Sequence, residues 1–375
     1  MNMVANLAGY QITDQLYTGT RTVVYRGIRS SDQITVAIKI LRNEYPNFNE
    51  LVQFRNQYTI AKNLDFPYII KPLNLEVYGN SYALVMEDIG GISLSNYIQK
   101  INHNKIHKSL PIVKFIKIAI KLTETLHYLY HNRVIHKDIK PANILINPDT
   151  KQVKLIDFSI SSLLPRETQE IQNPNILEGT LPYISPEQTG RMNRGIDYRS
   201  DFYSLGITFY ELLTGRLPFC AEDPMELVHC HLAKQPIPIQ EINPEISLIL
   251  SQIVSKLMAK NAEDRYQSAL GIKHDLENCL TQLQATGQIE DFELGQRDIS
   301  DRFLIPETLY GREKEVNQLL NAFERVSFNK TEMILVAGFS GVGKTAVINE
   351  IHKPIVRQRG YFIKGKYDQF QRNIP

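Results

Sequence analysis

The run from Ile135 to Asn143, which reads Ile-His-Lys-Asp-Ile-Lys-Pro-Ala-Asn, constrains this chain more than any comparable stretch. It places a carboxylate, Asp138, ahead of a cation, Lys140, and an amide, Asn143. In sites that transfer phosphoryl groups, an Asp accepts the proton of the attacking hydroxyl, and an Asn five positions later helps to hold Mg²⁺ against the nucleotide phosphates. Lys140 is placed to neutralise charge that develops on the transferred group. The run therefore predicts phosphoryl transfer as the reaction class.

The composition is that of a globular protein large enough for two domains. The chain has 375 residues, of which 43% are hydrophobic and 22% are charged, so a packed core is expected. The formal net charge of +2 shows no strong bias toward nucleic acid or a membrane surface. We therefore expect no nucleic-acid partner.

The amino terminus and the cysteines bear on the cellular compartment. Residues 1–10 lack the basic start and the apolar stretch of a signal peptide, and no segment approaches the about 18 apolar residues of a membrane span. Cys220, Cys230 and Cys279 show no C-x-x-C spacing, so neither a disulfide framework nor a zinc site is indicated. We expect a cytoplasmic protein without a membrane span and with reduced thiols.

Two segments of different periodicity follow one another. Strand-like runs at 23–25, 35–40, 69–77 and 82–86 predict a small sheet-rich lobe over residues 10–89. After the Gly90-Gly91 break, apolar residues at helical spacing from Ile112 to Leu129 predict a long helix. Further helical runs lie at 200–213, 225–232, 246–258 and 269–283. Residues 90–283 are expected to form a larger, mostly α lobe.

The pattern changes again after the last of these helices. Residues 284–305 are polar and partly acidic and are interpreted as a linker. From residue 306 a new pattern predicts a helix at 313–328, an apolar strand at 333–337, a glycine-rich turn and another helix. We therefore predict a tail over 1–9, a two-lobed domain over 10–283 and the beginning of a second domain over 306–375.

Five motifs in the first domain occur in the order found in protein kinases. They are Val36-Ala37-Ile38-Lys39, the run from His136 to Asn143, Asp157-Phe158-Ser159, Ser185-Pro186-Glu187 and Asp201. Residues 10–283 therefore resemble a protein kinase domain. The resemblance implies an α+β fold with a small β-rich N-lobe and a large, mostly α C-lobe.

The resemblance also implies roles for the matching residues. Lys39 is expected to contact the α- and β-phosphates of ATP, and Asp138 to orient the acceptor hydroxyl, with Lys140 beside it. Asn143 and Asp157 are expected to coordinate Mg²⁺. The resemblance also implies that Glu187 pairs with Arg265 as a structural carboxylate.

An adenine pocket is implied around the hinge between the lobes. Apolar side chains are expected to enclose the ring, and backbone groups of the segment from Met86 to Ile89 to hydrogen-bond it. The residues expected to bind the nucleotide in this domain are Leu16, Gly19, Val24, Ala37, Lys39, Met86, Glu87, Ile89 and Leu145.

The subclass is indicated by Lys140 together with Thr180 in Gly179-Thr180-Leu181-Pro182-Tyr183. Both resemble protein kinases that act on serine and threonine rather than on tyrosine. The resemblance implies a protein substrate with an aliphatic hydroxyl as acceptor.

Three departures from the family pattern leave the activity open. In the glycine-rich loop only Gly19 matches, while Tyr17 and Thr22 stand where the family has glycine and hinder close approach of the backbone to phosphate. Gln57 stands where a helix-borne glutamate should pair with Lys39. The candidates for replacing that glutamate are Glu44 and Glu50.

The third departure lies in the run from His136 to Asn143, which corresponds to the catalytic loop of the family, and in the motif Asp157-Phe158-Ser159. Lys137 replaces the usual arginine and Ser159 the usual glycine, and the first change removes the docking group for a phosphorylated activation loop. The alternative to an active kinase is therefore a weakly active kinase or a pseudokinase that senses nucleotide as a scaffold.

A second nucleotide site is predicted in the last domain. Residues 338–345 read Gly-Phe-Ser-Gly-Val-Gly-Lys-Thr and match G-x-x-x-x-G-K-[ST], after an apolar run and before a helix. Gly338, Gly341 and Gly343 would let backbone amides cradle phosphates. Lys344 would reach the β- and γ-phosphates of ATP, and Thr345 would ligate Mg²⁺.

The segment from Leu309 to Glu313 resembles the start of AAA-like P-loop ATPases. The fold class is thus a kinase followed by the incomplete beginning of an α/β P-loop domain. This order resembles the amino-terminal part of large bacterial, cyanobacterial-type signalling kinases, which carry sensor and histidine-kinase modules downstream. The third interpretation makes the P-loop domain a switch and the kinase its output.

Overall fold

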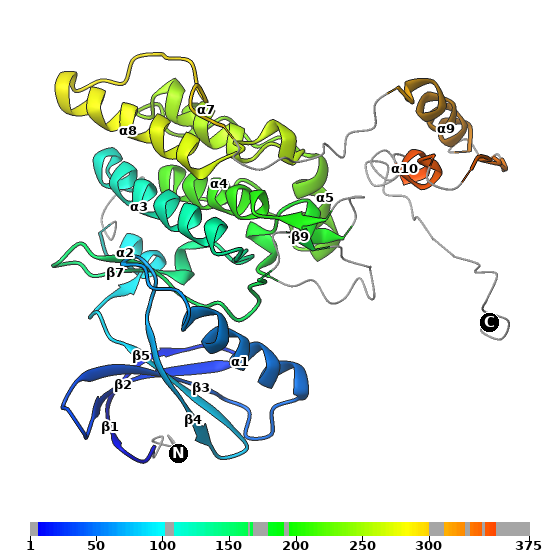
Figure 1. Cartoon of the computed structure of the whole chain (residues 1–375). Helices are drawn as coiled ribbons and strands as arrows, with labels where there is room; N and C mark the ends of the chain where they lie inside the picture. Colours follow the sequence, from blue (N-terminus) through cyan, green and yellow to red (C-terminus); the bar gives the residue numbers. More distant parts are fainter. Residues whose placement is uncertain are drawn as a thin grey trace, which may run out of the picture.

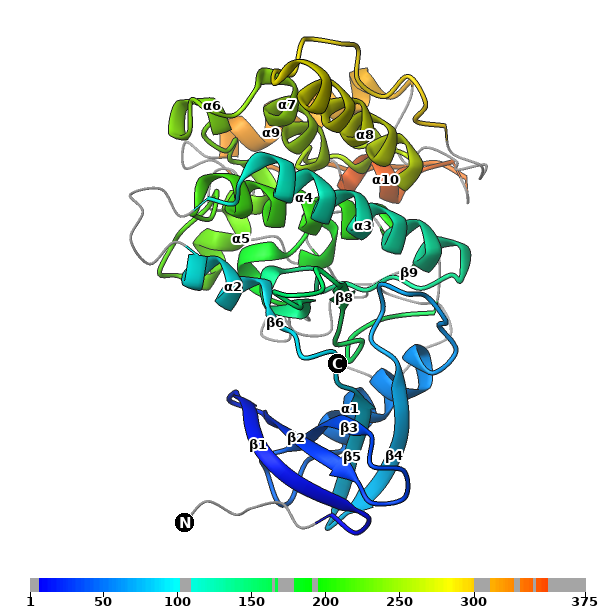
Figure 2. The same ribbon diagram turned by 90° about the vertical axis from the view of Figure 1, so that its left-hand side faces the viewer.

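A computed structural model describes residues 7–101, 109–163, 166–167, 179–190, 195–299, 311–326, 331–339 and 342–349. Within these residues a sheet with one helix is followed by a larger helical part, which lies above the sheet in Figure 1. Figure 2 shows the same two layers after a quarter turn. The predicted small β-rich lobe and large α lobe are confirmed. None of the described helices is both long and apolar enough to cross a lipid bilayer.

The N-lobe is a five-stranded antiparallel sheet in the order β1-β2-β3-β5-β4. One helix, α1, lies between β3 and β4 along the chain. The bounds of these elements are β1 Tyr10–Thr18, β2 Thr22–Arg29, β3 Thr35–Leu41, α1 Phe48–Ala61, β4 Pro72–Tyr78 and β5 Ser81–Glu87.

Alternation along β3 sends its side chains to opposite faces of the sheet. Val36, Ile38 and Ile40 are buried in a cluster on one face. Ala37 belongs to a second cluster, which also holds Phe54 of α1. Lys39 has the parity of Ala37, so its side chain is directed to the face that α1 covers.

The C-lobe is mainly helical and carries two small pieces of sheet. The strands are β6 Ile92–Ser93, β7 Ile144–Ile146 and β8 Val153–Leu155, which form one sheet, and β9 Arg166–Glu167 and β10 Ile196–Asp197, which form another. The helices are α2 Leu94–Ile101, α3 Ile112–His131, α4 Arg199–Thr214, α5 Pro224–Ala233, α6 Ile239–Ile242, α7 Leu248–Leu257 and α8 Ala269–Thr286. Short 3₁₀ turns lie at Pro141–Asn143, Leu181–Tyr183, Glu187–Thr189 and Ala262–Asp264.

The core of the C-lobe is one large cluster centred on α3 and α4. The helix predicted from Ile112 to Leu129 is confirmed as α3, whose Ile116, Ala119 and Leu122 are buried as the periodicity predicts, whereas Val113 is exposed. Helix α4 is buried along nearly its whole length, including Phe202, and crosses the middle of the lobe. The loop of residues 136–143 is attached to α4, because Asp201 accepts the N–H of His136 and Thr208 donates to the carbonyl of Ile139.

The segment predicted to be a linker, 284–305, differs from that expectation where the structure describes it. Its first residues belong to α8, and Figure 1 shows the chain turning back over the lobe after that helix. Ile289, Phe292 and Leu294 pack against the core of the C-lobe. Asp298 accepts hydrogen bonds from the backbone N–H groups of Gln267 (2.9 Å) and Ser268 (2.8 Å). Residues 287–298 thus belong to the C-lobe.

The last part contains α9 Glu313–Val326 and α10 Lys344–Asn349, which contact each other. The strand predicted at 333–337 is wrong, because residues 331–339 form neither helix nor strand. Met333 and Leu335 are 94% and 86% exposed. Strands are stable only beside a partner strand, and none of the described residues of 311–349 pairs with this segment.

Candidate active site

Lys39 lies in the interior between β3 and α1. Its Nζ donates a hydrogen bond to Oε1 of Gln57 at 2.9 Å and lies 3.1 Å from Oδ1 of Asp157. Lys39 and Gln57 are only 8% and 3% exposed. The prediction that Gln57 occupies the partner position of Lys39 is therefore confirmed.

The two glutamates proposed as substitutes have other places. Glu50 closes the N-terminus of α1, because its side chain accepts from the N–H of Asn47 while Oδ1 of Asn47 accepts from the N–H of Glu50, each at 2.9 Å. Such a capping box fixes the start of a helix. Glu44 is exposed, and its carbonyl faces the side chain of Asn80. Among the described residues neither carboxylate forms a hydrogen bond or ion pair with Lys39, so α1 contacts Lys39 through the amide of Gln57.

Asp138 is the centre of a small polar cluster on the catalytic loop. Its Oδ2 accepts from Nζ of Lys140 (2.6 Å) and from Nδ2 of Asn143 (2.8 Å). Its Oδ1 accepts from the hydroxyl of Thr180 at 2.8 Å, and Lys140 also donates to that hydroxyl. The loop thus brings together the predicted residues Asp138, Lys140 and Asn143. Thr180, which directly precedes the 3₁₀ turn Leu181–Tyr183, completes the cluster.

The catalytic loop is held by a carboxylate at the start of α4. Asp201 accepts the backbone N–H groups of His136 and Lys137, each at 2.7 Å. Lys137 has a φ of 69°, which L-residues adopt only when their surroundings impose it. Burial raises the pKa of Asp201 to about 7, although the two N–H donors and the nearby Lys137 act in the opposite direction. Asp201 therefore shapes the loop that presents Asp138.

Asp157 faces Lys39 and lies in the left-handed region, with a φ of 70°. Burial by itself raises the pKa of this carboxyl, but the charge and hydrogen bond of Lys39 and the hydrogen bond of Ser159 outweigh it and lower the pKa. The carboxylate is thus ionised near neutral pH. The neighbouring Phe158 is buried with its ring against that of His136, with centroids 4.8 Å apart.

The residues predicted to hold Mg²⁺ suit that ion. Asn143 uses its Nδ2 to donate to the carbonyl and the carboxylate of Asp138, so its amide oxygen remains as a ligand. Asp157 supplies an ionised carboxylate. Carboxylate and amide oxygens are ligands that Mg²⁺ prefers, with further positions taken by water and substrate phosphates.

The residues predicted to surround adenine lie together, with one exception. One hydrophobic cluster contains Ala37 and Met86, with Val24, Ile89 and Leu145 packed against it. Leu16 lies on β1 and is exposed. The side chain of Glu87 accepts a hydrogen bond from Nζ of Lys154 at 2.6 Å. Only the backbone groups of Glu87 are therefore available for the predicted contact with adenine.

The hinge is braced from both lobes. Nδ2 of Asn147 donates to the carbonyl of Ile89 at 2.6 Å. Arg26 of β2 forms an ion pair with Asp88, whose carboxylate also accepts the N–H of Gly90 at 2.8 Å. The segment from Met86 to Gly90 is therefore held by contacts to both lobes.

The loop between β1 and β2 is closed by hydrogen bonds at Gly19 and has a tyrosine beside this glycine. The N–H of Gly19 donates to the carbonyl of Thr22 at 2.9 Å, and Arg42 donates to the carbonyl of Gly19 at 2.9 Å. A Cβ atom at Gly19 would lie 2.5 Å from the hydroxyl of Tyr17. Tyr17 therefore occupies the space next to the one glycine that the loop retains.

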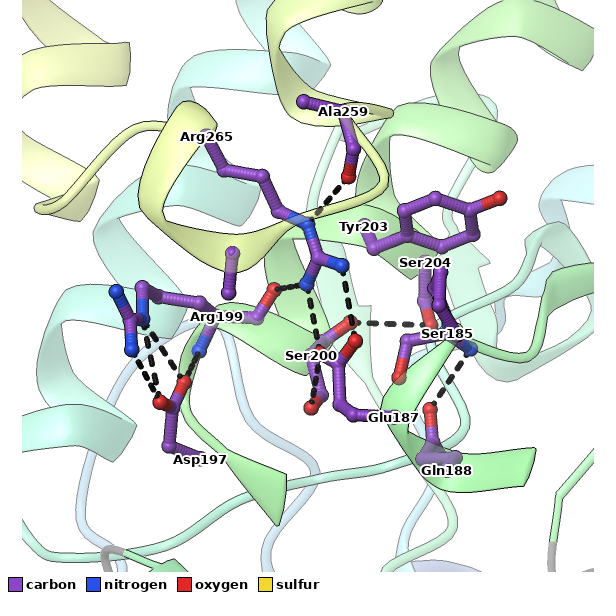
Figure 3. A network of polar contacts seen from close by, with 12 residues as sticks. Ser185, Glu187, Gln188, Asp197, Arg199, Ser200, Tyr203, Ser204, Ala259 and Arg265 are labelled. Atoms are coloured by element: carbon purple, nitrogen blue, oxygen red, sulfur yellow. Dashed lines mark hydrogen bonds and ion pairs between the residues drawn. The ribbon is translucent and has the colours of Figure 1, made fainter. Parts of the chain in front are cut away.

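The predicted pair of Glu187 and Arg265 is confirmed and is shown in Figure 3. The guanidinium donates to Oε1 and Oε2 of Glu187 at 2.6 and 2.9 Å, and both side chains are almost completely buried. Ser200 of α4 also donates to Glu187, at 2.6 Å. Burial alone would raise the pKa of Glu187, but the charge of Arg265 lowers it to about 2.

The second predicted nucleotide site is described only in part. Gly343 has a φ of 94° and precedes α10. Nζ of Lys344 donates to the carbonyls of Gly338 (2.7 Å) and Phe339 (2.8 Å). The lysine side chain is therefore hydrogen-bonded to the backbone of the glycine-rich loop. Gly341 and the side chain of Thr345 lie outside the described residues.

One residue of the site had no signal in the sequence. Asn56, next to Gln57 on α1, donates through Nδ2 to the carbonyls of Ser161 (2.9 Å) and Ser159 (3.3 Å). These carbonyls lie one and three residues after Phe158. Reasoning from sequence missed it because the contact joins segments about a hundred residues apart.

Comparison with known proteins agrees with this geometry. The family model described as protein kinase domain matches residues 10–276, so the chain belongs to the protein kinase family. The model described as AAA ATPase domain matches residues 308–375.

Three similar proteins illustrate the relationship. The hybrid signal transduction histidine kinase G of Dictyostelium discoideum is 36% identical over an alignment that covers 72% of this chain and 10% of that protein. The serine/threonine-protein kinase PknB of Mycobacterium leprae is 33% identical over 276 residues, covering 71% of this chain and 42% of that protein. PrkC of Bacillus subtilis is 34% identical over 247 residues, covering 65% and 36%. The chain spans less than half the length of each of these relatives.

Proposed function

We propose that the chain is an ATP- and Mg²⁺-dependent protein kinase that transfers the γ-phosphoryl group of ATP to serine or threonine hydroxyls of a protein substrate in bacterial signal transduction. The observation that supports this most is the cluster in which Asp138, Lys140, Asn143 and Thr180 meet within hydrogen-bonding distance. Lys140 and Thr180 mark the serine/threonine subclass, and the bacterial relatives carry the same description in their names.

Each side chain has a defined part in the reaction. Asp138 orients the acceptor hydroxyl and takes its proton, as a positioned carboxylate does in this chemistry. Lys140, at 2.6 Å from Asp138, balances negative charge as the phosphoryl group moves. Lys39 contacts the α- and β-phosphates, and Asn143 and Asp157 would hold Mg²⁺. When bound, Mg²⁺ neutralises charge on the β- and γ-phosphates.

The test is the identity of the phosphorylated product. The chain is incubated with labelled ATP, Mg²⁺ and a generic protein substrate, and the acid-hydrolysed product is separated into phosphoamino acids. We expect phosphoserine and phosphothreonine. Label on tyrosine alone would contradict the assignment of the acceptor.

A second candidate is a weakly active kinase or a pseudokinase that senses nucleotide. It is favoured by Tyr17, whose side chain covers Gly19, and by the neutral Gln57 beside Lys39. This candidate predicts nucleotide binding without transfer. Binding of a fluorescent ATP analogue, measured next to transfer on the same preparation, separates the two.

For the remaining part of the chain we propose an AAA-like P-loop site for ATP and Mg²⁺ built from Gly338, Gly341, Gly343, Lys344 and Thr345. The domain boundaries we propose are 10–283 for the kinase, with residues 287–298 attached to its C-lobe, and 306–375 for the start of the ATPase domain. We also propose a cytoplasmic location and, in a longer cyanobacterial-type protein, downstream sensor or histidine-kinase modules. The name of the Dictyostelium relative supports such modules.

A switch role for the P-loop is a further part of this proposal. Lys344 bonds to the carbonyls of its own loop, so nucleotide has to displace it. Lys344→Ala in a full-length protein is expected to change how the kinase responds to its input signal. An unchanged response would contradict the coupling.

A further inference from the structure

Helix α1 is joined to the segment after Asp157 by the side chain of Asn56. Its Nδ2 donates to the carbonyl of Ser161 at 2.9 Å and to the carbonyl of Ser159 at 3.3 Å. The first distance is that of a normal hydrogen bond, and the second is a weaker, shared one. A single amide of the N-lobe thus holds two carbonyls on the chain that follows the metal-binding carboxylate.

The C-lobe side of this segment is anchored separately. Ser162 and Ile135 exchange backbone hydrogen bonds at 3.0 and 2.9 Å, and the hydroxyl of Ser161 donates to the carbonyl of His136 at 3.1 Å. The segment is therefore fixed from below by the catalytic loop. From the N-lobe it is reached by Asn56 and, one step earlier, by Lys39 through Asp157.

The conformation of Asp157 is stabilised by these anchors. Its φ of 70° lies in the left-handed region, which Asp adopts more readily than most L-residues but which is less favourable than the right-handed or extended regions. A change of φ or ψ at Asp157 would shift the chain that follows, where the carbonyls of Ser159 and Ser161 lie two and four residues further on. Holding the carbonyls of Ser159 and Ser161 therefore limits the orientations open to the carboxylate of Asp157.

The neutral Gln57 increases the importance of this contact. A glutamate at this place would join α1 to Lys39 by an ion pair, whereas Gln57 offers one hydrogen bond of 2.9 Å. Asp157 is the carboxylate that meets the charge of Lys39, at 3.1 Å. Helix α1 is thus connected to the site through two adjacent amides, Asn56 and Gln57.

We propose that Asn56 is a positioning residue for Asp157. It fixes the backbone at 159–161 against α1 and so keeps the Asp157 carboxylate where Mg²⁺ can bind. Asn56 thus connects α1 to the proposed metal site. A glutamate at position 57 would add a second, ionic connection through Lys39, which the neutral Gln57 does not provide. The inference rests on the proposed function only in assigning the metal to Asp157.

The test compares Asn56→Ala with Asn49→Ala, a matched change at an exposed asparagine of the same helix. Asn56→Asp is the second variant, since it keeps the size of the side chain and removes both donors. The first readout is hydrogen exchange of the amides of 157–162 in protein without nucleotide or metal. We expect these amides to exchange about tenfold faster in both Asn56 variants, because the hydrogen bonds from α1 to the carbonyls of Ser159 and Ser161 are lost. Asn49→Ala should show wild-type exchange rates.

The second readout is the Mg²⁺ concentration that gives half-maximal binding of a fluorescent ATP analogue. It should rise about three- to tenfold in the Asn56 variants, while binding of the analogue in EDTA stays unchanged. Exchange and Mg²⁺ dependence equal to those of Asn49→Ala would overturn the proposal. So would faster exchange that extends to α3, since that would mean a general loss of structure.

The proposed function fails separately from this inference. A chain that binds the analogue but transfers no phosphate would contradict the kinase assignment. The exchange of 157–162 and its dependence on Asn56 would still be measured in that chain, and a tenfold difference there would support the positioning role.

Discussion

Nζ of Lys39 lies 2.9 Å from the amide oxygen of Gln57 and donates a hydrogen bond to it inside the N-lobe. The same ammonium group lies 3.1 Å from Asp157. Lys39 is therefore held on both sides although α1 carries no carboxylate at residue 57. Gln57 adds no negative charge beside Lys39, so Asp157, the proposed Mg²⁺ ligand, is also the carboxylate that faces this ammonium group.

The first prediction concerns Gln57→Glu. Because Lys39 is already held, a carboxylate at 57 should raise the rate of phosphate transfer by less than about tenfold, the effect of roughly one added charge-assisted hydrogen bond. Steady-state kcat and the KM for ATP provide the measurement. Gln53→Glu, one turn earlier on α1, adds the same charge as a control. A gain of a hundredfold or more would favour the pseudokinase interpretation instead.

The second prediction concerns Thr180, whose hydroxyl donates to Asp138 at 2.8 Å and accepts from Lys140. Thr180→Val keeps the shape but removes the hydroxyl, so Asp138 and Lys140 lose their common partner. We expect kcat to fall by about 10- to 100-fold, the lower part of the range for a disturbed general base. Thr180→Ser should stay within a few-fold of the wild type. A wild-type kcat in Thr180→Val would show that this contact does not matter.

Much of this site could be predicted from local sequence. The kinase motifs fix Lys39, Asp138 and Asn143 because each lies in a short run with its own spacing, and the lobes follow from hydrophobic periodicity. Asn56 could not be predicted, since nothing in its neighbourhood indicates a contact with Ser161.

Two larger segments also escaped prediction, for physical reasons. The composition of the polar stretch after α8 indicates a linker. Yet the apolar side chains of Ile289, Phe292 and Leu294, together with Asp298, attach this stretch to the C-lobe. The apolar run at 333–337 has strand-forming residues, but a strand exists only with a neighbour, which local sequence does not reveal.

The third prediction concerns the buried pair of Glu187 and Arg265 (Figure 3). Glu187→Gln leaves the guanidinium buried without its counter-charge and should lower the free energy of unfolding by about 3–5 kcal/mol. Urea unfolding at neutral pH measures this. Glu293→Gln, an exposed site, is the control and should be close to neutral.

The same pair should make stability depend on pH. The pKa of Glu187 is lowered in the folded protein from 4.5 to about 2, so the folded state binds this proton less readily than the unfolded state. The stabilisation is fully present above pH 4.5 and is lost as the pH falls toward 2. As the pH falls from 4.5 toward 2, the free energy of unfolding should decrease less in Glu187→Gln than in the wild type, because the variant lacks this carboxyl. An equal decrease in both proteins would contradict the assignment of this pH dependence to Glu187.

The fourth prediction concerns Asp298, which accepts from the N–H groups of Gln267 and Ser268 at the start of α8. A carboxylate at a helix N-terminus contributes to stability through these bonds and the helix dipole. Asp298→Ala should cost about 1–2 kcal/mol and speed proteolysis within 287–298. Asp291→Ala, an exposed change in the same segment, should do neither. Equal proteolysis of the two variants would mean that Asp298 does not attach the segment.

The most direct test of the whole account is transfer of labelled phosphate from ATP by the wild-type chain and by Asp138→Asn. The substitution keeps the size of the side chain and removes the carboxylate that accepts the proton. We expect transfer by the wild type, a reduction of at least about a hundredfold in the variant, and the same circular dichroism and thermal unfolding for both. Wild-type transfer no greater than that of folded Asp138→Asn would contradict the assignment of this chain as an active kinase.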